Sequence, residues 1–123
     1  MLRLLLDEHV ARAVAAGLRR RDRTLVVRTA AEWEGGAFLG RDDAAFLREA
    51  AEQRFTLVTY DRRTIPTLLK TWAEEGRSHG GVIFVDEKTI SPADVGGLVR
   101  ALSALVRQTG NWEWVDRVVF LRR

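Results

Sequence analysis

Short apolar runs alternate along this chain with segments in which apolar residues recur every three or four positions. Runs without regular polar alternation are typical of strands that are buried on both faces, as in a parallel sheet. They predict five strands, at residues 2–6, 24–28, 55–60, 82–85 and 112–121.

The segments between these runs have the apolar period of amphipathic helices. They predict four helices, at residues 9–21, 42–53, 64–75 and 91–109. Ser91 and Pro92 mark the expected start of the last helix, because proline is favoured in a first helical turn, and Gly110 marks its end. Strands that alternate with helices predict one α/β domain over residues 1–123, a three-layer α/β/α sandwich with a mostly parallel central sheet.

Composition limits the chemistry that this domain can perform. A length of 123 residues suits one domain with one hydrophobic core. The absence of cysteine excludes disulfides, thiolate zinc sites and a cysteine nucleophile. No apolar run approaches the roughly 20 residues that span a bilayer, so we expect a cytoplasmic protein that does not enter a membrane.

The charge of the chain is compatible with a nucleic-acid partner. The net charge is +3 and the pI is near 10.1, and lysine occurs only at positions 70 and 88, so almost every basic side chain is an arginine. Guanidinium groups bind phosphate well, but many exposed arginines only pair with neighbouring carboxylates. Charge alone therefore leaves RNA binding and a merely solvated surface as alternatives.

Three aspartates are expected at one edge of the sheet. Asp7 and Asp61 each follow a predicted strand, and Asp43 begins a predicted helix whose N-terminus should lie at the same edge. Ligands of open α/β sheets bind at the carboxyl ends of the strands. Each residue also has a structural alternative, since Asp7 and Asp43 suit the first turns of helices and Asp61 can hold a turn.

Three gathered carboxylates repel one another unless a cation offsets their charge. Oxygen ligands without cysteine favour Mg²⁺ or Mn²⁺ over zinc, and Mg²⁺ commonly keeps water molecules that a substrate phosphate can displace. The pattern therefore predicts a metal site at Asp7, Asp43 and Asp61 that hydrolyses phosphodiester bonds with a metal-bound water as nucleophile.

Several motifs resemble the small stand-alone prokaryotic proteins of the PIN-like superfamily. They are LLLDEHV at the N-terminus, DDAAFL at residues 42–47, LVTYD at residues 57–61 and HGGVIFV at residues 79–85. The resemblance covers roughly the first 85 residues. It implies a three-layer fold and an Mg²⁺- or Mn²⁺-dependent endoribonuclease, many of the family being toxins that a partner antitoxin neutralises.

The resemblance also assigns roles to individual residues. Asp7, Asp43 and Asp61 match the acidic metal and catalytic positions, and Thr59 matches the polar residue before the last of them. We expect Glu8 and Asp42, like Thr59, to contact these ligand side chains and orient them. Homodimers are common in the family, and the aromatic residues within 112–121 would suit such a contact.

One position departs from the family pattern. Members commonly read DRDF at this turn, whereas the chain has Arg63 where the second acid would stand. A lost carboxylate and an added cation would weaken metal binding. Alternatively, Arg62 and Arg63 would hold the phosphate of the substrate, since arginine is a bidentate phosphate partner.

Two other functions remain open at this point. The first is a PIN-like module that has lost catalysis and binds RNA or protein, an interpretation that Arg63 motivates. The second is a phosphoacceptor domain similar to response-regulator receivers, in which Asp61 would be phosphorylated and Lys88 would contact the phosphate. Receivers carry that lysine one strand later and have Ser or Thr where this chain has Asp86.

Overall fold

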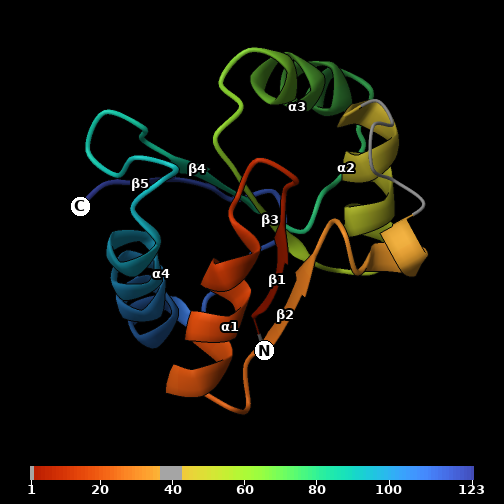
Figure 1. Ribbon diagram of the computed structural model, residues 1–123. Coiled ribbons are helices and arrows are strands. Elements are labelled where there is room, and N and C mark those ends of the chain that lie inside the picture. The colour runs from red at the N-terminus through yellow and green to blue at the C-terminus, as the bar shows by residue number, and fades with distance from the viewer. Residues whose placement is uncertain (1, 37–42) are drawn as a thin grey trace.

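A parallel sheet forms the centre of the protein in the computed structural model, which describes residues 2–36 and 43–123 (Figure 1). The described residues form five strands in the order β2-β1-β3-β4-β5, and every neighbouring pair is parallel. The strands are β1 (Arg3–Leu6), β2 (Val26–Thr29), β3 (Thr56–Thr59), β4 (Val82–Val85) and β5 (Val118–Leu121). The predicted α/β class is confirmed.

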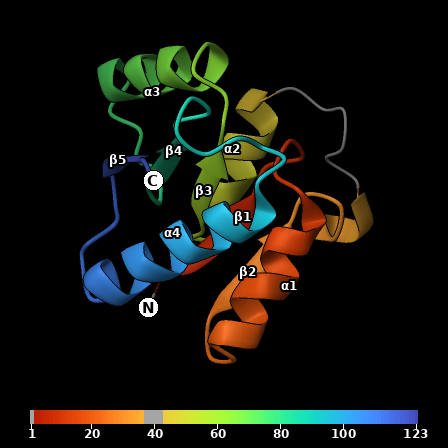
Figure 2. The ribbon, with the colours of Figure 1, turned by 60° about the vertical axis from the view of Figure 1, so that its left-hand side comes forward.

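Helices cover both faces of this sheet (Figures 1 and 2). They are α1 (Arg12–Arg21), α2 (Asp43–Glu52), α3 (Thr64–Glu74) and α4 (Val95–Thr109), with a short 3-10 turn, η1 (Trp33–Gly36), before α2. α1 and α4 pack on one face, and α2 and α3 pack on the other.

Alternation of side chains along the strands builds both cores at once. In β1, Leu4 and Leu6 face α1 and α4, while Leu5 between them faces α2 and α3. All three side chains are completely buried. Each central strand is therefore apolar on both faces, which is why the sequence shows continuous apolar runs there.

The connection through α4 has the opposite hand to the connections through α1, α2 and α3. From β3 to β4 and from β4 to β5 the chain advances in the same direction across the sheet, yet α3 and α4 lie on opposite faces (Figure 2). Parallel crossovers are almost always right-handed. A uniformly wound domain would place α4 beside α3, whereas here α4 packs against α1.

α1 and β5 begin several residues later than expected from the sequence. α1 begins at Arg12 rather than at residue 9, because a turn follows β1, in which the N–H of Val10 donates to the carbonyl of Asp7 (2.9 Å). β5 begins at Val118 rather than at residue 112, because Trp114 turns into the core and its indole N–H donates to the carbonyl of Thr109 (3.2 Å).

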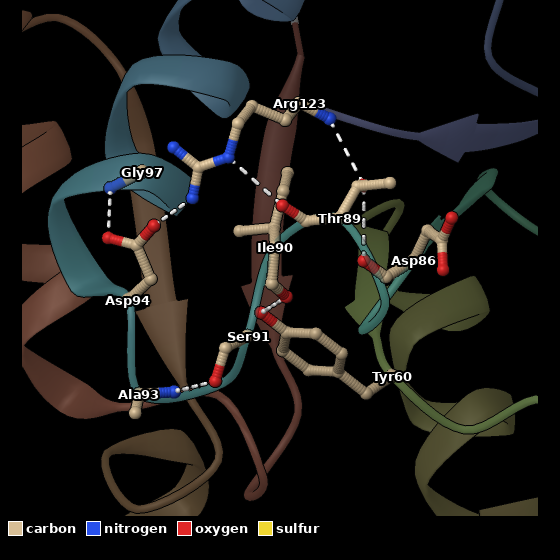
Figure 3. Close-up of polar contacts among 9 residues, drawn as sticks. All are labelled: Tyr60, Asp86, Thr89, Ile90, Ser91, Ala93, Asp94, Gly97 and Arg123. Atoms are coloured by element: carbon tan, nitrogen blue, oxygen red, sulfur yellow. Dashed lines mark hydrogen bonds and ion pairs between the residues drawn. The ribbon is translucent and has the colours of Figure 1, made fainter.

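The start of α4 is also later than expected. Ser91 and Pro92 precede the helix, and the Ser91 hydroxyl accepts a hydrogen bond from the N–H of Ala93 (3.2 Å), as Figure 3 shows. The cap is Asp94, whose carboxylate accepts a hydrogen bond from the N–H of Gly97 (2.9 Å). Serine before proline thus forms a turn here, and the cap stands three residues further on.

Candidate acidic site at the carboxyl edge of the sheet

The direction of strand addition reverses between β1 and β3, and the predicted acidic residues lie at the carboxyl end of this pair. β1 is followed by Asp7, and β3 ends at Thr59, two residues before Asp61. Asp43 is the first residue of α2, whose C-terminal end leads back into β3. Such a reversal is where open α/β sheets bind ligands.

The hydroxyl of Thr59 joins Asp7 to Asp61. It donates a hydrogen bond to the Oδ2 atom of Asp7 (2.7 Å) and accepts one from the backbone N–H of Asp61 (3.0 Å). Thr59 is fully buried and Asp7 is 7% exposed, so the hydrogen bond between their side chains is shielded from water. The other carboxylate oxygen of Asp7, Oδ1, accepts the N–H of Glu8 (2.7 Å). Asp7 is therefore fixed in position.

Asp43 and Asp61 share a hydrogen bond between their carboxyl groups. Partial burial, that hydrogen bond and the negative charges of Asp61, Asp7 and Glu8 raise the pKa of Asp43 to about 6. Two carboxyl groups in contact cannot both ionise easily, so below about pH 6 one proton stays between them. Asp43 holds that proton in slightly acidic solution.

Asp61 is held mainly in its ionised form. Burial acts to raise its pKa, but the N–H groups of Thr64 and Arg63 and the carboxyl group of Asp43 donate hydrogen bonds that together lower it. The Oδ1 atom accepts the N–H of Arg63 at 2.8 Å and that of Thr64 at 2.9 Å. Asp61 thus satisfies donors at the start of α3 while it faces Asp43.

Glu8 and Asp42 were also expected to support the ligands. Glu8 is exposed, but its charge contributes to the raised pKa of Asp43, and its N–H orients Asp7. Asp42 lies outside the described residues. The expectation for Asp42 therefore stays a prediction.

The two arginines of the turn occupy different surroundings. Arg62 forms an ion pair with Asp86 (3.9 Å), and its guanidinium carbon lies 5.6 Å from the ring centre of Phe120. Arg63 is exposed, and among the described residues its guanidinium forms no ion pair with a carboxylate. The positive charge of Arg63 therefore does not neutralise the described aspartates through an ion pair.

Asp86 is a member of this edge that the sequence reasoning did not assign to the site. It follows β4 directly, as Asp7 follows β1, so the pattern of an apolar run followed by aspartate could have found it. Its carboxylate lies between Arg62 (3.9 Å) and Arg122 (3.8 Å). Asp86 thereby holds a guanidinium group on the β4 side of the acidic residues.

The acidic residues fit a hard divalent cation in their donor chemistry, since every donor is a carboxylate oxygen. Asp43 and Asp61 share a hydrogen bond, and the negative charge of Asp7 acts on Asp43. Within residues 2–36 and 43–123, no three acidic or histidine side chains lie close enough together to share a metal ion. Metal binding would therefore require Asp43 to lose its proton and the carboxylates to approach.

The chain was compared with family models, curated proteins and solved structures. None of them matches. The assignment of this edge rests on its geometry and on the motifs quoted above. Among the described residues, none of the helices has the length and apolar character needed to cross a membrane.

A groove lies at the opposite edge of the sheet. It has a volume of about 570 Å³ between the end of α3 and the start of β5, and its lining includes Lys70, His79 and Asp116. Burial lowers the pKa of His79, although Asp116 acts in the opposite direction. The Nδ1 atom of His79 accepts the N–H of Gly81 (3.0 Å), so this histidine holds the turn before β4.

Proposed function

We propose that this protein is a Mg²⁺- or Mn²⁺-dependent phosphodiesterase that cleaves RNA, an endoribonuclease of the PIN-like kind. One observation carries the proposal. Asp43 and Asp61 form a hydrogen-bonded carboxyl pair near the buried Asp7 at the reversal point of the sheet, where burial, that hydrogen bond and the neighbouring negative charges raise the pKa of Asp43 to about 6. Such a perturbed acidic group at a ligand-binding edge is typical of a functional site.

Asp7, Asp43 and Asp61 would hold the cation, and Thr59 would keep Asp7 oriented through its hydroxyl. A bound divalent cation supplies a water of lowered pKa and offsets charge on the phosphoryl group. Release of the shared proton from Asp43 would accompany its binding. Affinity for the cation is therefore expected to increase as the pH rises through about 6.

Substrate phosphate would contact the arginines of the turn. Arg62 is held by Asp86, while Arg63 lies at the start of α3 with its guanidinium exposed to solvent. These cations follow directly after Asp61 in the chain. In this role Arg63 would contact the substrate phosphate from the position where family members have an acidic residue. A phosphate contact agrees with the net charge of +3. A toxin role with a partner antitoxin would rest on the family resemblance alone.

The test is cleavage of a fluorescent single-stranded RNA of mixed sequence with Mn²⁺, with Mg²⁺ and with EDTA. Asp61→Asn and Asp43→Asn should each lower the rate by a factor of about 100 or more, because metal-centred charge stabilisation contributes several kcal/mol. Asp22→Asn is the matched control, since Asp22 caps the far end of α1. It should cleave at the wild-type rate.

Other results would support different functions. RNA binding without cleavage under any metal condition would identify a binding module that has lost catalysis. Cleavage that persists unchanged in Asp61→Asn would show that the activity does not belong to this edge. Calorimetric titration of each protein with Mn²⁺ alone, at pH 5 and pH 8, measures metal binding directly. It therefore separates a protein that has lost its metal site from one that has lost only RNA binding.

The strand order favours one second candidate, a phosphoacceptor domain. The order β2-β1-β3-β4-β5 is also that of flavodoxin-like proteins and receivers. Against it, α4 lies on the face of α1, and Asp61 already accepts two backbone hydrogen bonds. Incubation with acetyl phosphate should leave the mass unchanged, and a gain of one phosphoryl group on Asp61 would favour the receiver.

A further inference from the structure

β5 is the last strand of the sheet, and one of its faces is uncovered (Figure 1). On the face of α4 its Leu121 is buried, whereas on the face of α2 and α3 Phe120 is 55% exposed and Val118 is 40% exposed. Among the described residues, the core beneath α2 and α3 includes buried side chains of β4 but none of β5. The protein therefore presents an aromatic ring to solvent at this end of the sheet.

The ring of Phe120 is held in place by its neighbour on β4. It stacks on Phe84, with ring centres 5.5 Å apart and an angle of 22° between the ring planes. Phe84 is itself buried, so it is a fixed support. The exposed part of the Phe120 ring is thus a flat apolar surface that loses little conformational freedom when a ligand binds to it.

Phe120 also lies in the same row of the sheet as a residue of the acidic site. The strand register aligns Thr59 with Phe84, and Phe84 with Phe120. The hydroxyl of Thr59 donates to Asp7 (2.7 Å). Because neighbouring strands are about 4.8 Å apart, the backbone of Phe120 lies roughly 10 Å from that of Thr59. A group bound on the Phe120 ring would therefore be close to a phosphate bound at the acidic residues.

The surroundings of this ring carry more positive than negative charge. The guanidinium carbon of Arg62 lies 5.6 Å from the ring centre of Phe120. The carboxylate of Asp86 lies 3.9 Å from Arg62 and 3.8 Å from Arg122, whose side chains are 51% and 70% exposed. Two exposed cations around one carboxylate leave a net positive charge, which favours an anionic partner.

The nearby guanidinium of Arg62 leaves room against the ring. Closer guanidinium–ring pairs of this protein have separations of 4.2–4.5 Å and involve Arg3, Arg77 and Arg117. Arg62 lies further from the Phe120 ring than these arginines lie from theirs, and it is paired with Asp86. A planar group can therefore approach Phe120 with a cation beside it.

We propose that Phe120 is a stacking platform for one unpaired base of single-stranded RNA, with Arg62 and Arg122 on the phosphates beside that base. A supported aromatic ring next to cations suits a single strand, because every base has a flat face and every phosphate is negative. The base would belong to a nucleotide close to the cleaved bond. This inference rests on the proposed function, since it extends the substrate from the acidic residues to β5.

The platform would also select against double-stranded RNA. Bases within a duplex stack on one another, so their faces are not available to a protein side chain, whereas bases of single strands can turn outward and stack on aromatic residues. Phe120 would therefore contribute to the binding of a single strand and contribute nothing to the binding of a duplex.

Fluorescence anisotropy with a labelled single-stranded RNA of mixed sequence, in EDTA to prevent cleavage, measures the contribution of the ring. Phe120→Leu should weaken binding by about 10-fold, because it removes the stacking surface and keeps an apolar side chain. Phe120→Trp should bind at least as tightly as wild type. Trp112→Leu is the matched control, since Trp112 is also an exposed aromatic residue but lies before β5, and its affinity should be that of wild type.

Two further measurements separate the base contact from the phosphate contacts. Affinity for single-stranded RNA should depend on salt equally in Phe120→Leu and wild type, whereas Arg62→Gln should lower the slope of log affinity against log salt by about 0.7, the contribution of one phosphate contact. A duplex of the same sequence should bind wild type and Phe120→Leu with equal affinity.

Cleavage of RNAs that each lack one base then locates the subsite along the substrate. With Mn²⁺, loss of the base at one position near the cleaved bond should slow wild type by about 10-fold, and loss of the same base should not slow Phe120→Leu further. A rate that is insensitive to every missing base would overturn the proposed subsite.

The outcomes distinguish this subsite from the proposed function. Cleavage by wild type together with unchanged RNA affinity in Phe120→Leu would overturn the subsite and leave the nuclease in place. Binding that depends on Phe120, without cleavage under any metal condition, would support the subsite and overturn the nuclease, and a protein that binds no RNA would overturn both. Equal losses in Phe120→Leu and Trp112→Leu would also overturn the subsite. So would a dimer that Phe120→Leu dissociates with no change in RNA affinity, because the ring would then contact a second copy.

Discussion

The raised pKa of Asp43 ties the stability of the protein to pH at a single residue. The pKa of Asp43 rises from 3.8 to about 6 on folding, first because of burial and then because of Asp61. The folded state therefore binds more protons than the unfolded state between these values. The stabilisation from protonated Asp43 is fully present below the unfolded pKa and is lost as the pH rises through about 6.

Asp43→Asn should keep the hydrogen bond to Asp61 without titrating, since the amide donates as the protonated acid does. In EDTA, its stability relative to wild type should increase from pH 4 upward and level off above about pH 6. The gain should reach about 1 kcal/mol, after allowance for the solvent screening of a partly exposed group. Urea unfolding of both proteins across this range measures it, and a difference that does not vary with pH would contradict the argument.

The positions of the three aspartates follow from the sequence, but their interactions do not. An aspartate after an apolar run predicts a place at the end of a strand, and Asp7 lies there. The bridge from Asp7 through Thr59 depends on the register of β1 against β3, which aligns Leu6 with Val58. A hydrophobic pattern does not specify that register, so the sequence placed Thr59 in the site only through the family resemblance.

At the scale of elements, apolar runs locate the strands well because buried strands need continuous apolar residues. Helix starts are harder to predict, because serine, proline and aspartate all suit both caps and turns. The loop before α4 contains all three types, and only the hydrogen bonds in Figure 3 distinguish the cap from the turn.

Asp94 and Ser91 therefore provide a matched pair of substitutions. Asp94→Ala should lower the free energy of unfolding by about 1 kcal/mol or somewhat more, because it removes the cap of α4 and the ion pair with Arg123. Ser91→Ala removes only an exposed turn contact and should cost much less. Chemical denaturation of both variants decides between the two starts, and a larger loss in Ser91→Ala would restore the start expected from the sequence.

At the scale of the whole molecule, the face on which α4 packs is the feature that sequence could not predict. An amphipathic helix can cover either face of a sheet, and the usual right-handed crossover would favour the face of α2 and α3. The observed packing is instead supported by a close approach to α1. A Cβ atom added at Gly17 would lie 2.7 Å from a methyl group of Val99, so glycine is needed where the helices meet.

Substitution of Gly17 tests the packing of α4 against α1, because the sign of the change in stability depends on it. If α4 packed on the other face, Gly17→Ala would stabilise α1 by up to about 1 kcal/mol, because alanine favours helix. With α4 against α1, the added methyl must displace Val99, and overpacking of this kind costs about 1–3 kcal/mol, which outweighs the helical gain. We therefore expect Gly17→Ala to lower the free energy of unfolding in urea titrations. In a Val99→Ala background the clash is absent, so the same substitution should become stabilising, and this coupling is expected only if the two residues touch.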